Sequence, residues 1–186
     1  MKILAAFLLL LGIAVAQQHS PEYRSAERKL AAMDAYDANP AAAGLLTTLT
    51  DAEMNAYFAE GGIKWGDGVS NVRISTAPST VHASAQIDFD KVTAKARSSN
   101  PLLGIFTGIH TVRITAQAAA LHGRGSVKVQ SVSLDGTEIP PAVLELFIVK
   151  FLQPKYPEAD LDAVFGMPNR IDSATVGDHQ ITFAQR

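Results

Sequence analysis

Hydrophobic positions near the start of the chain recur with the period of a helix. Leu30 and Met33 stand at helical spacing, and Pro21 suits the first position of a helix. These positions predict a helix from Ser20 to Ala38, which Asn39-Pro40 would end. The residues that follow, 41–49, are compatible with a linker or with a continuation of the helix.

A second helix is predicted to begin directly after Thr50. The Thr50 hydroxyl can accept the backbone N–H of Glu53 while the Glu53 carboxylate reaches back to the backbone N–H of Thr50, which is the pattern of a capping box. Leu49 and Met54 stand where a hydrophobic staple places its two apolar side chains. Because Gly61-Gly62 is a typical helix end, the helix is expected over about residues 51–60.

The hydrophobic period then changes from about 3.6 to 2, which indicates antiparallel strands with one wet face. In the clearest of these strands, His82, Ser84 and Gln86 alternate with small or branched apolar residues. A shift of the apolar positions from odd to even numbers predicts a bulge near Gln130-Ser131, and Asp135-Gly136 predicts a turn. The expected strands cover residues 72–75, 81–89, 112–120, 127–134, 171–176 and 180–183.

A helix over residues 142–152 stands out because only Glu145 and Lys150 in it are not apolar. An ordinary surface helix has a wide polar face, and this one has none. It is either a core helix or one wall of an apolar groove. Four apolar side chains share one stripe of this helix and are the candidate ligand contacts: Leu144, Phe147, Ile148 and Phe151.

Composition narrows the classes of function. The chain has 186 residues with 16 Lys+Arg against 18 Asp+Glu, so the formal net charge of -2 argues against a nucleic-acid binder. There is no cysteine, which excludes disulfides, thiolate catalysis and cysteine-ligated metals. We therefore expect a single α+β domain over residues 45–186, preceded by an N-terminal helix and linker over 17–44.

The first residues resemble an export signal. Lys2 precedes an apolar run from Ile3 to Ala14, and Ala14-Val15-Ala16 has the small-x-small form of a cleavage site. We expect residues 1–16 to be removed and the protein to be periplasmic or extracellular. A retained N-terminal anchor is the alternative.

Signs of catalytic chemistry are sparse. None of the five histidines lies in an HExxH frame, and no GxSxG elbow is present. Asp88 and Asp90 share the wet face of one strand, and Asp160 and Asp162 share a loop; each pair is more typical of solvated acids than of a site. Trp65, the only tryptophan, is a candidate for contact with an apolar ligand at a loop, or a cover for one end of the sheet. No enzyme activity, metal or cofactor is expected.

Three segments resemble small bacterial members of the tubular lipid-binding superfamily, the group related to bactericidal permeability-increasing protein. They are the helix start at residues 49–55, the lead into a strand at 68–72, and the strand from Gly125 through Ile139-Pro140-Pro141 into an apolar helix. The resemblance spans residues 45–186. It implies a curved antiparallel sheet wrapped around helices that binds lipid or another apolar molecule without catalysis.

The sequence therefore predicts an α+β fold, with a highly twisted antiparallel sheet wrapped around one or two apolar helices. The favoured function is non-catalytic binding of a lipid or other apolar small molecule in the cell envelope, with transient membrane contact and no nucleic acid. An envelope scaffold or protein-interaction module with a filled core is the alternative. An enzyme that uses Asp88 and Asp90 is a third hypothesis.

Overall fold

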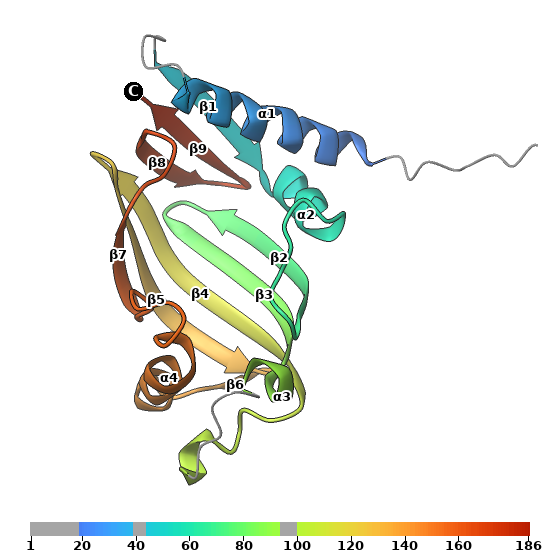
Figure 1. Ribbon diagram of the computed structural model, residues 1–186, viewed down its shortest axis with the longest axis vertical. Helices are drawn as coiled ribbons and strands as arrows, with labels where there is room; N and C mark the ends of the chain where they lie inside the picture. Colours follow the sequence, from blue (N-terminus) through green and yellow to red (C-terminus); the bar gives the residue numbers. More distant parts are fainter. Residues whose placement is uncertain (1–18, 39–43, 94–99) are drawn as a thin grey trace, which may run out of the picture.

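The computed structural model describes residues 19–38, 44–93 and 100–186, and Figure 1 shows their arrangement. The expected signal segment, residues 1–16, lies outside the described residues, and so does the Asn39-Pro40 helix stop. The helices are α1 (Pro21–Asp37), α2 (Asp51–Ala59), α3 (Phe89–Val92) and α4 (Pro141–Phe147), with a 3₁₀ turn at Pro101–Leu103 and a π-helical turn at Ile148–Leu152. The strands are β1 (Leu45–Thr50), β2 (Val69–Ala77), β3 (Thr80–Asp88), β4 (Ile109–Leu121), β5 (Arg124–Leu134), β6 (Thr137–Glu138), β7 (Asp162–Gly166), β8 (Ile171–Gly177) and β9 (Gln180–Gln185).

Within the described residues, the strands form one nine-stranded antiparallel sheet. Its main path runs β1-β9-β8-β4-β3-β2, and β5 pairs with β4 while carrying β6 and β7 on its other side. The sheet does not close on itself. β4 pairs with β8 only through Ala120 and Ala174, so the β8–β9–β1 part joins the rest at one end of β4. The predicted α+β fold built on an antiparallel sheet is confirmed.

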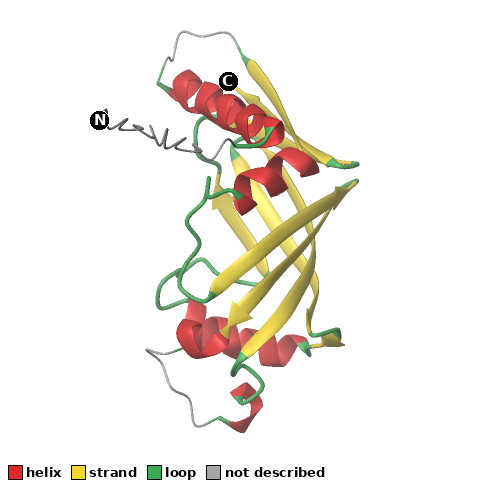
Figure 2. Ribbon diagram, turned by 90° about the vertical axis from the view of Figure 1, so that its right-hand side faces the viewer, coloured by secondary structure: helices red, strands yellow, loops and turns green. Residues whose placement is uncertain are grey.

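Two separate hydrophobic clusters hold the helices on this sheet. α1 and α2 lie toward one end of the molecule and α4 toward the other, on the same side of the sheet (Figure 2). The cluster beneath α1 and α2 has Ala26, Leu49 and Met54 as its buried residues. The cluster beside α4 has these buried residues: Phe89, Leu103, Phe106, Val132, Leu134, Ile139, Leu144 and Phe147.

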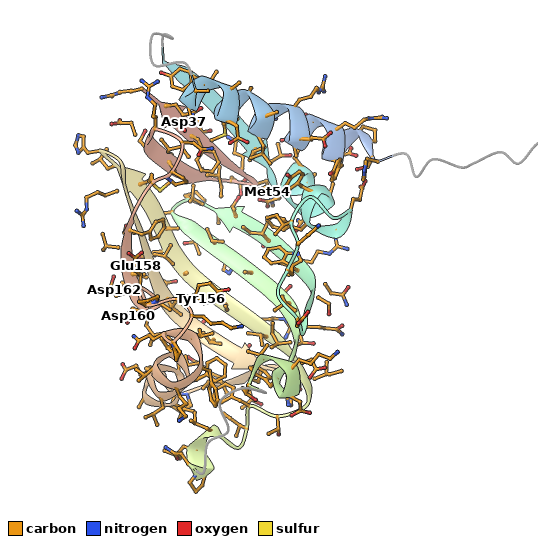
Figure 3. The ribbon with its side chains drawn as sticks, viewed as in Figure 1. Asp37, Met54, Tyr156, Glu158, Asp160 and Asp162 are labelled. Atoms are coloured by element: carbon orange, nitrogen blue, oxygen red, sulfur yellow. The ribbon has the colours of Figure 1, made fainter. Side chains whose placement is uncertain are left out.

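The local sequence signals agree closely with the structure at several points. The Thr50 hydroxyl accepts the Glu53 N–H at 3.2 Å, and the Glu53 carboxylate accepts the Thr50 N–H at 2.9 Å, so the capping box is formed. Leu49 and Met54 are buried in one cluster, with Met54 on the sheet side of α2 (Figure 3). The predicted bulge is confirmed, because Thr115 pairs with residue 131 while Ala116 pairs with residue 129.

The structure differs from the sequence predictions at several elements. The strand expected over 81–89 ends at Asp88, and Asp90 lies in α3, so these two acids do not share one face of a strand. Residues 45–49, part of the segment expected as linker or helix, form β1 together with Thr50 because β9 supplies a full antiparallel partner, pairing Leu45 with Gln185 and Thr50 with Gln180. Residues 162–166, expected as a loop, form β7 against β5. The helix expected over 142–152 is α-helical only to Phe147 and widens into a π turn, in which Gln153 N donates to Ile148 O at 2.9 Å.

Candidate apolar binding face

The alternation of side chains along β2 to β5 defines which residues face the helices. The register places Ile74 beside Ala83, Ala83 beside Ile114, and Ile114 beside Val132. Ile74 packs in the cluster beneath α2, and Val132 is buried in the cluster beside α4. Since neighbouring residues in register point to the same side of a sheet, all four face the helices.

The middle of this row is only partly covered. Ile114 is 36% exposed, although it lies at the centre of the sheet on the side that carries the helices. Ala83 and its neighbours Ala85 and Val112 are half-buried. We call Ile74, Ala83, Ala85, Val112 and Ile114 the central strip. It is an apolar surface between the two clusters. The small side chains of Ala83 and Ala85 project little from the sheet, which leaves space above them.

The four residues of the 142–152 segment that were predicted to contact a ligand lie together at one end of the molecule. Leu144 and Phe147 are buried, at 8% and 9% exposure, and Ile148 and Phe151 are half-buried. The Phe147 ring lies 4.3 Å from that of Phe106 and 5.1 Å from that of Phe151, measured between centroids. Leu144 and Phe147 therefore contribute to a packed core, while the edge formed by Ile148 and Phe151 is more accessible.

Trp65 lies with the other cluster. Its ring meets Phe58 of α2 edge-on at a centroid distance of 5.3 Å, and the residue is 38% exposed. Phe58 packs against the Leu49 and Met54 cluster, whereas Leu144 and Phe147 belong to the cluster beside α4. The predicted site residues are thus divided between two clusters, with the central strip between them.

The central strip was not identified from the sequence. The period-two pattern shows which way Ala83 and Ile114 face, but the same pattern is typical of a fully covered strand. What exposes Ile114 is the position of the helices at the two ends of the sheet, which the sequence does not encode locally.

The candidate acids have local structural partners. Asp88 caps α3, accepting the Lys91 N–H and forming an ion pair with the Lys91 ammonium at 3.2 Å. The hydrogen bond from Lys91 outweighs the opposing effect of burial and lowers the pKa of Asp88. Asp90 accepts the Gly108 N–H at 3.1 Å. Both carboxylates help to fix the chain around the start of β4.

Three acids lie on the segment between α4 and the start of β7. Glu158, Asp160 and Asp162 follow one another along the segment that leads into β7 (Figure 3). Asp160 accepts its neighbour's N–H, and Asp162 pairs with Lys128 in the sheet register. Within the described residues, no three His, Asp or Glu side chains are placed to hold a metal ion.

Both ring nitrogens of His110 have a hydrogen-bonding partner. Its Nδ1 lies 2.7 Å from the Asp135 carboxylate and its Nε2 lies 2.7 Å from the Thr107 carbonyl. Because both neighbours are acceptors, the protonated ring, which donates from both nitrogens, fits best. The hydrogen bond to Asp135 and then that to Thr107 raise the pKa of His110. This arrangement fixes the loop before β4.

Comparison with protein families, curated proteins and solved structures gave no match for this chain. The resemblance to tubular lipid-binding proteins therefore stays a prediction. None of the helices in the described ranges is long and apolar enough to cross a membrane. What is established is an open antiparallel α+β fold, whose helix-bearing face carries two apolar clusters and an incompletely covered strip between them.

Proposed function

We propose that the chain is an exported, non-catalytic protein that binds a lipid or another apolar ligand in the cell envelope, on the central strip. The observation that carries the proposal is the exposure of Ile114. It lies between two apolar clusters, on the side of the sheet that faces the helices. A ligand laid across the strip would contact apolar side chains along its whole length.

The dimensions of the strip suit a flexible chain. With about 4.8 Å between neighbouring strands, the row from Ile74 to Val132 spans roughly 14 Å. Burial of each methylene contributes about 0.8 kcal/mol, so about eight methylenes would contribute roughly 6 kcal/mol. The loss of translational and rotational freedom on association reduces this gain. A dissociation constant above roughly 40 μM is therefore expected.

The test places a charge on the strip. Ile114→Asp should reduce binding of a fluorescent fatty acid by about tenfold or more, because a carboxylate would meet the apolar chain. Its effect on stability should be modest, since water already reaches Ile114. Ile109→Asp is the matched control: Ile109 is in the same strand, is 68% exposed, and points to the opposite face.

The result is informative in either direction. Equal binding by wild type and Ile114→Asp, with both proteins folded in a thermal melt, would contradict the proposal. A loss of binding in Ile109→Asp equal to that in Ile114→Asp would show that charge alone, rather than the strip, controls uptake.

Transient membrane contact belongs to the same proposal. Near α4, large apolar side chains point outward from two neighbouring segments: Leu102, Ile105, Leu146 and Val149. Such residues are suited to a brief contact with a lipid surface, from which a ligand could pass to the protein.

The second candidate is an envelope scaffold or interaction module with no ligand. The observation that favours it is the packing of Phe147 and Leu144, which fills the core beside α4. Absence of apolar ligand binding by the wild-type protein, together with a stable fold, would favour this candidate.

A further inference from the structure

The sheet face opposite the helices is polar between β2 and β4. Along β2, β3 and β4, the residues that alternate with the central strip are polar and form two adjacent rows. In the first row Arg73 pairs with Ser84, and Ser84 pairs with Arg113. In the second row Ser75 pairs with His82, and His82 pairs with Thr115. We call these six residues the polar patch.

A hollow of about 320 Å³ coincides with this patch. It is lined by the six patch residues and by the three residues between the two rows, Ile74, Ala83 and Ile114. The neighbouring central-strip residues Ala85 and Val112, and the helices, do not line it. Because the patch supplies two complete rows of side chains, the hollow opens on the face opposite the helices. Its volume is near the lower end of small-ligand sites, which run from about 300 Å³.

The two charged side chains that line the hollow, Arg73 and Arg113, are both positive. No carboxylate is among the nine lining residues, and within the described part of the chain neither Arg73 nor Arg113 forms an ion pair. The closest acid along β3 on the same face, Asp88, is already paired with Lys91. Two guanidinium groups thus flank a serine hydroxyl with no carboxylate in the hollow itself, while Asp135, outside the hollow, interacts electrostatically with Arg113.

The spacing of the two arginines suits a single small anion. Ser84 lies between them on β3, so two strand spacings of about 4.8 Å put their Cα atoms roughly 10 Å apart. Each guanidinium presents a planar set of N–H donors that matches phosphate oxygens. Extended inward over Ser84, the two side chains can bind one phosphate group from opposite sides, with the hydroxyl beneath it. His82, held at 3.1 Å from Thr115 Oγ1, borders the same space.

We propose that the polar patch binds a phosphate-type oxyanion between Arg73 and Arg113. The polar side chains of the site lie on the face opposite the side chains of the central strip, and the two surfaces share the strand positions of Ile74, Ala83 and Ile114. A phosphate group could come from a soluble ion or from an anionic lipid headgroup, and the recognition chemistry is the same for both.

The experiment uses two probes and a set of variants that remove arginine charges inside or outside the hollow. Calorimetric titration with inorganic phosphate reports on the soluble ion. Sedimentation with vesicles of phosphatidylglycerol in phosphatidylcholine, compared with phosphatidylcholine alone, reports on the headgroup. Arg73→Gln/Arg113→Gln should reduce binding of the effective probe by at least tenfold without shifting the thermal melt. Arg124→Gln, an exposed arginine outside the hollow, should leave binding unchanged.

A third variant, Ser84→Glu, places a carboxylate between the arginines. It should abolish anion binding while preserving or raising the melting temperature, because it supplies the missing partner. Binding that is lost in both Arg73→Gln/Arg113→Gln and Ser84→Glu supports the proposal. Binding of inorganic phosphate identifies a soluble ion as the source, and binding of phosphatidylglycerol vesicles only identifies a lipid headgroup. Binding of neither probe by wild type, or undiminished binding by the double variant, would overturn it.

Discussion

The carboxylate of Glu53 connects α1, β1 and α2, and its removal should be costly. Glu53 is 7% exposed. It accepts hydrogen bonds from the Lys29 ammonium at 2.6 and 2.8 Å, from the Ser25 hydroxyl at 2.6 Å and from the Thr50 N–H at 2.9 Å. Burial alone would raise the pKa of Glu53. The bond from Lys29, followed by those from Ser25 and Thr50, outweighs burial and lowers the pKa from 4.5 to about 2.

The pKa shift of Glu53 determines how much its ionised carboxylate stabilises the fold and how this contribution depends on pH. At about 1.36 kcal/mol per pKa unit, ionised Glu53 contributes at most roughly 3 kcal/mol to the free energy of unfolding. Because the pKa is lower in the folded protein, this contribution is present above pH 4.5 and is lost as the pH falls toward about 2. Glu53→Gln should therefore cost about 2–3 kcal/mol at pH 7, and much less near pH 2.

Urea denaturation at several pH values between 7 and 2.5 measures this difference. Glu27→Gln is the control, because Glu27 is exposed on α1, the helix that also carries Lys29. A double-mutant cycle with Lys29→Met isolates the ion pair, whose partners should be coupled. If wild type and Glu53→Gln lost stability in parallel as the pH fell, the ionised carboxylate would not be the source of the stabilisation.

Three further predictions concern stability. Thr50→Ala should lower the free energy of unfolding by about 1 kcal/mol, the usual effect of losing an N-cap, and an unchanged denaturant midpoint would contradict this. The pKa of His110, measured by NMR titration, should exceed 6.5. The stabilisation that protonated His110 gains from Asp135 and Thr107 is then fully present below pH 6.5 and is lost as the pH rises through the folded pKa. Phe147→Asp should cost several kcal/mol and unfold the protein in circular dichroism, because Phe147 is buried against aromatic rings; a folded variant would show that water reaches the site.

The features that were predicted from sequence are those decided by neighbouring residues. The Thr50–Glu53 capping box needs only a four-residue segment, and the bulge beside Ser131 follows from a change of parity within one strand. The helix and strand periods likewise arise within single elements. In each case the determining contacts lie close together along the chain.

The features that were missed depend on distant partners. β1 becomes a strand because Leu45 meets Gln185 at the far end of the chain, and β7 forms because β5 is already in place. The stripe that includes Phe147 was recognised as one face, but its burial depends on Phe89 and Phe106 from other segments. Exposure of Ile114 is set by the whole arrangement of helices, and no local pattern encodes it.

The most direct test of apolar ligand binding is methyl NMR on protein labelled at isoleucine, titrated with a fatty acid. If the ligand binds on the central strip, the Ile114 and Ile74 methyl signals should show saturable shifts, with little change at Ile109, which points to the opposite face. Unchanged Ile114 and Ile74 signals at fatty-acid concentrations that saturate binding elsewhere, or the absence of any binding, would contradict the proposal.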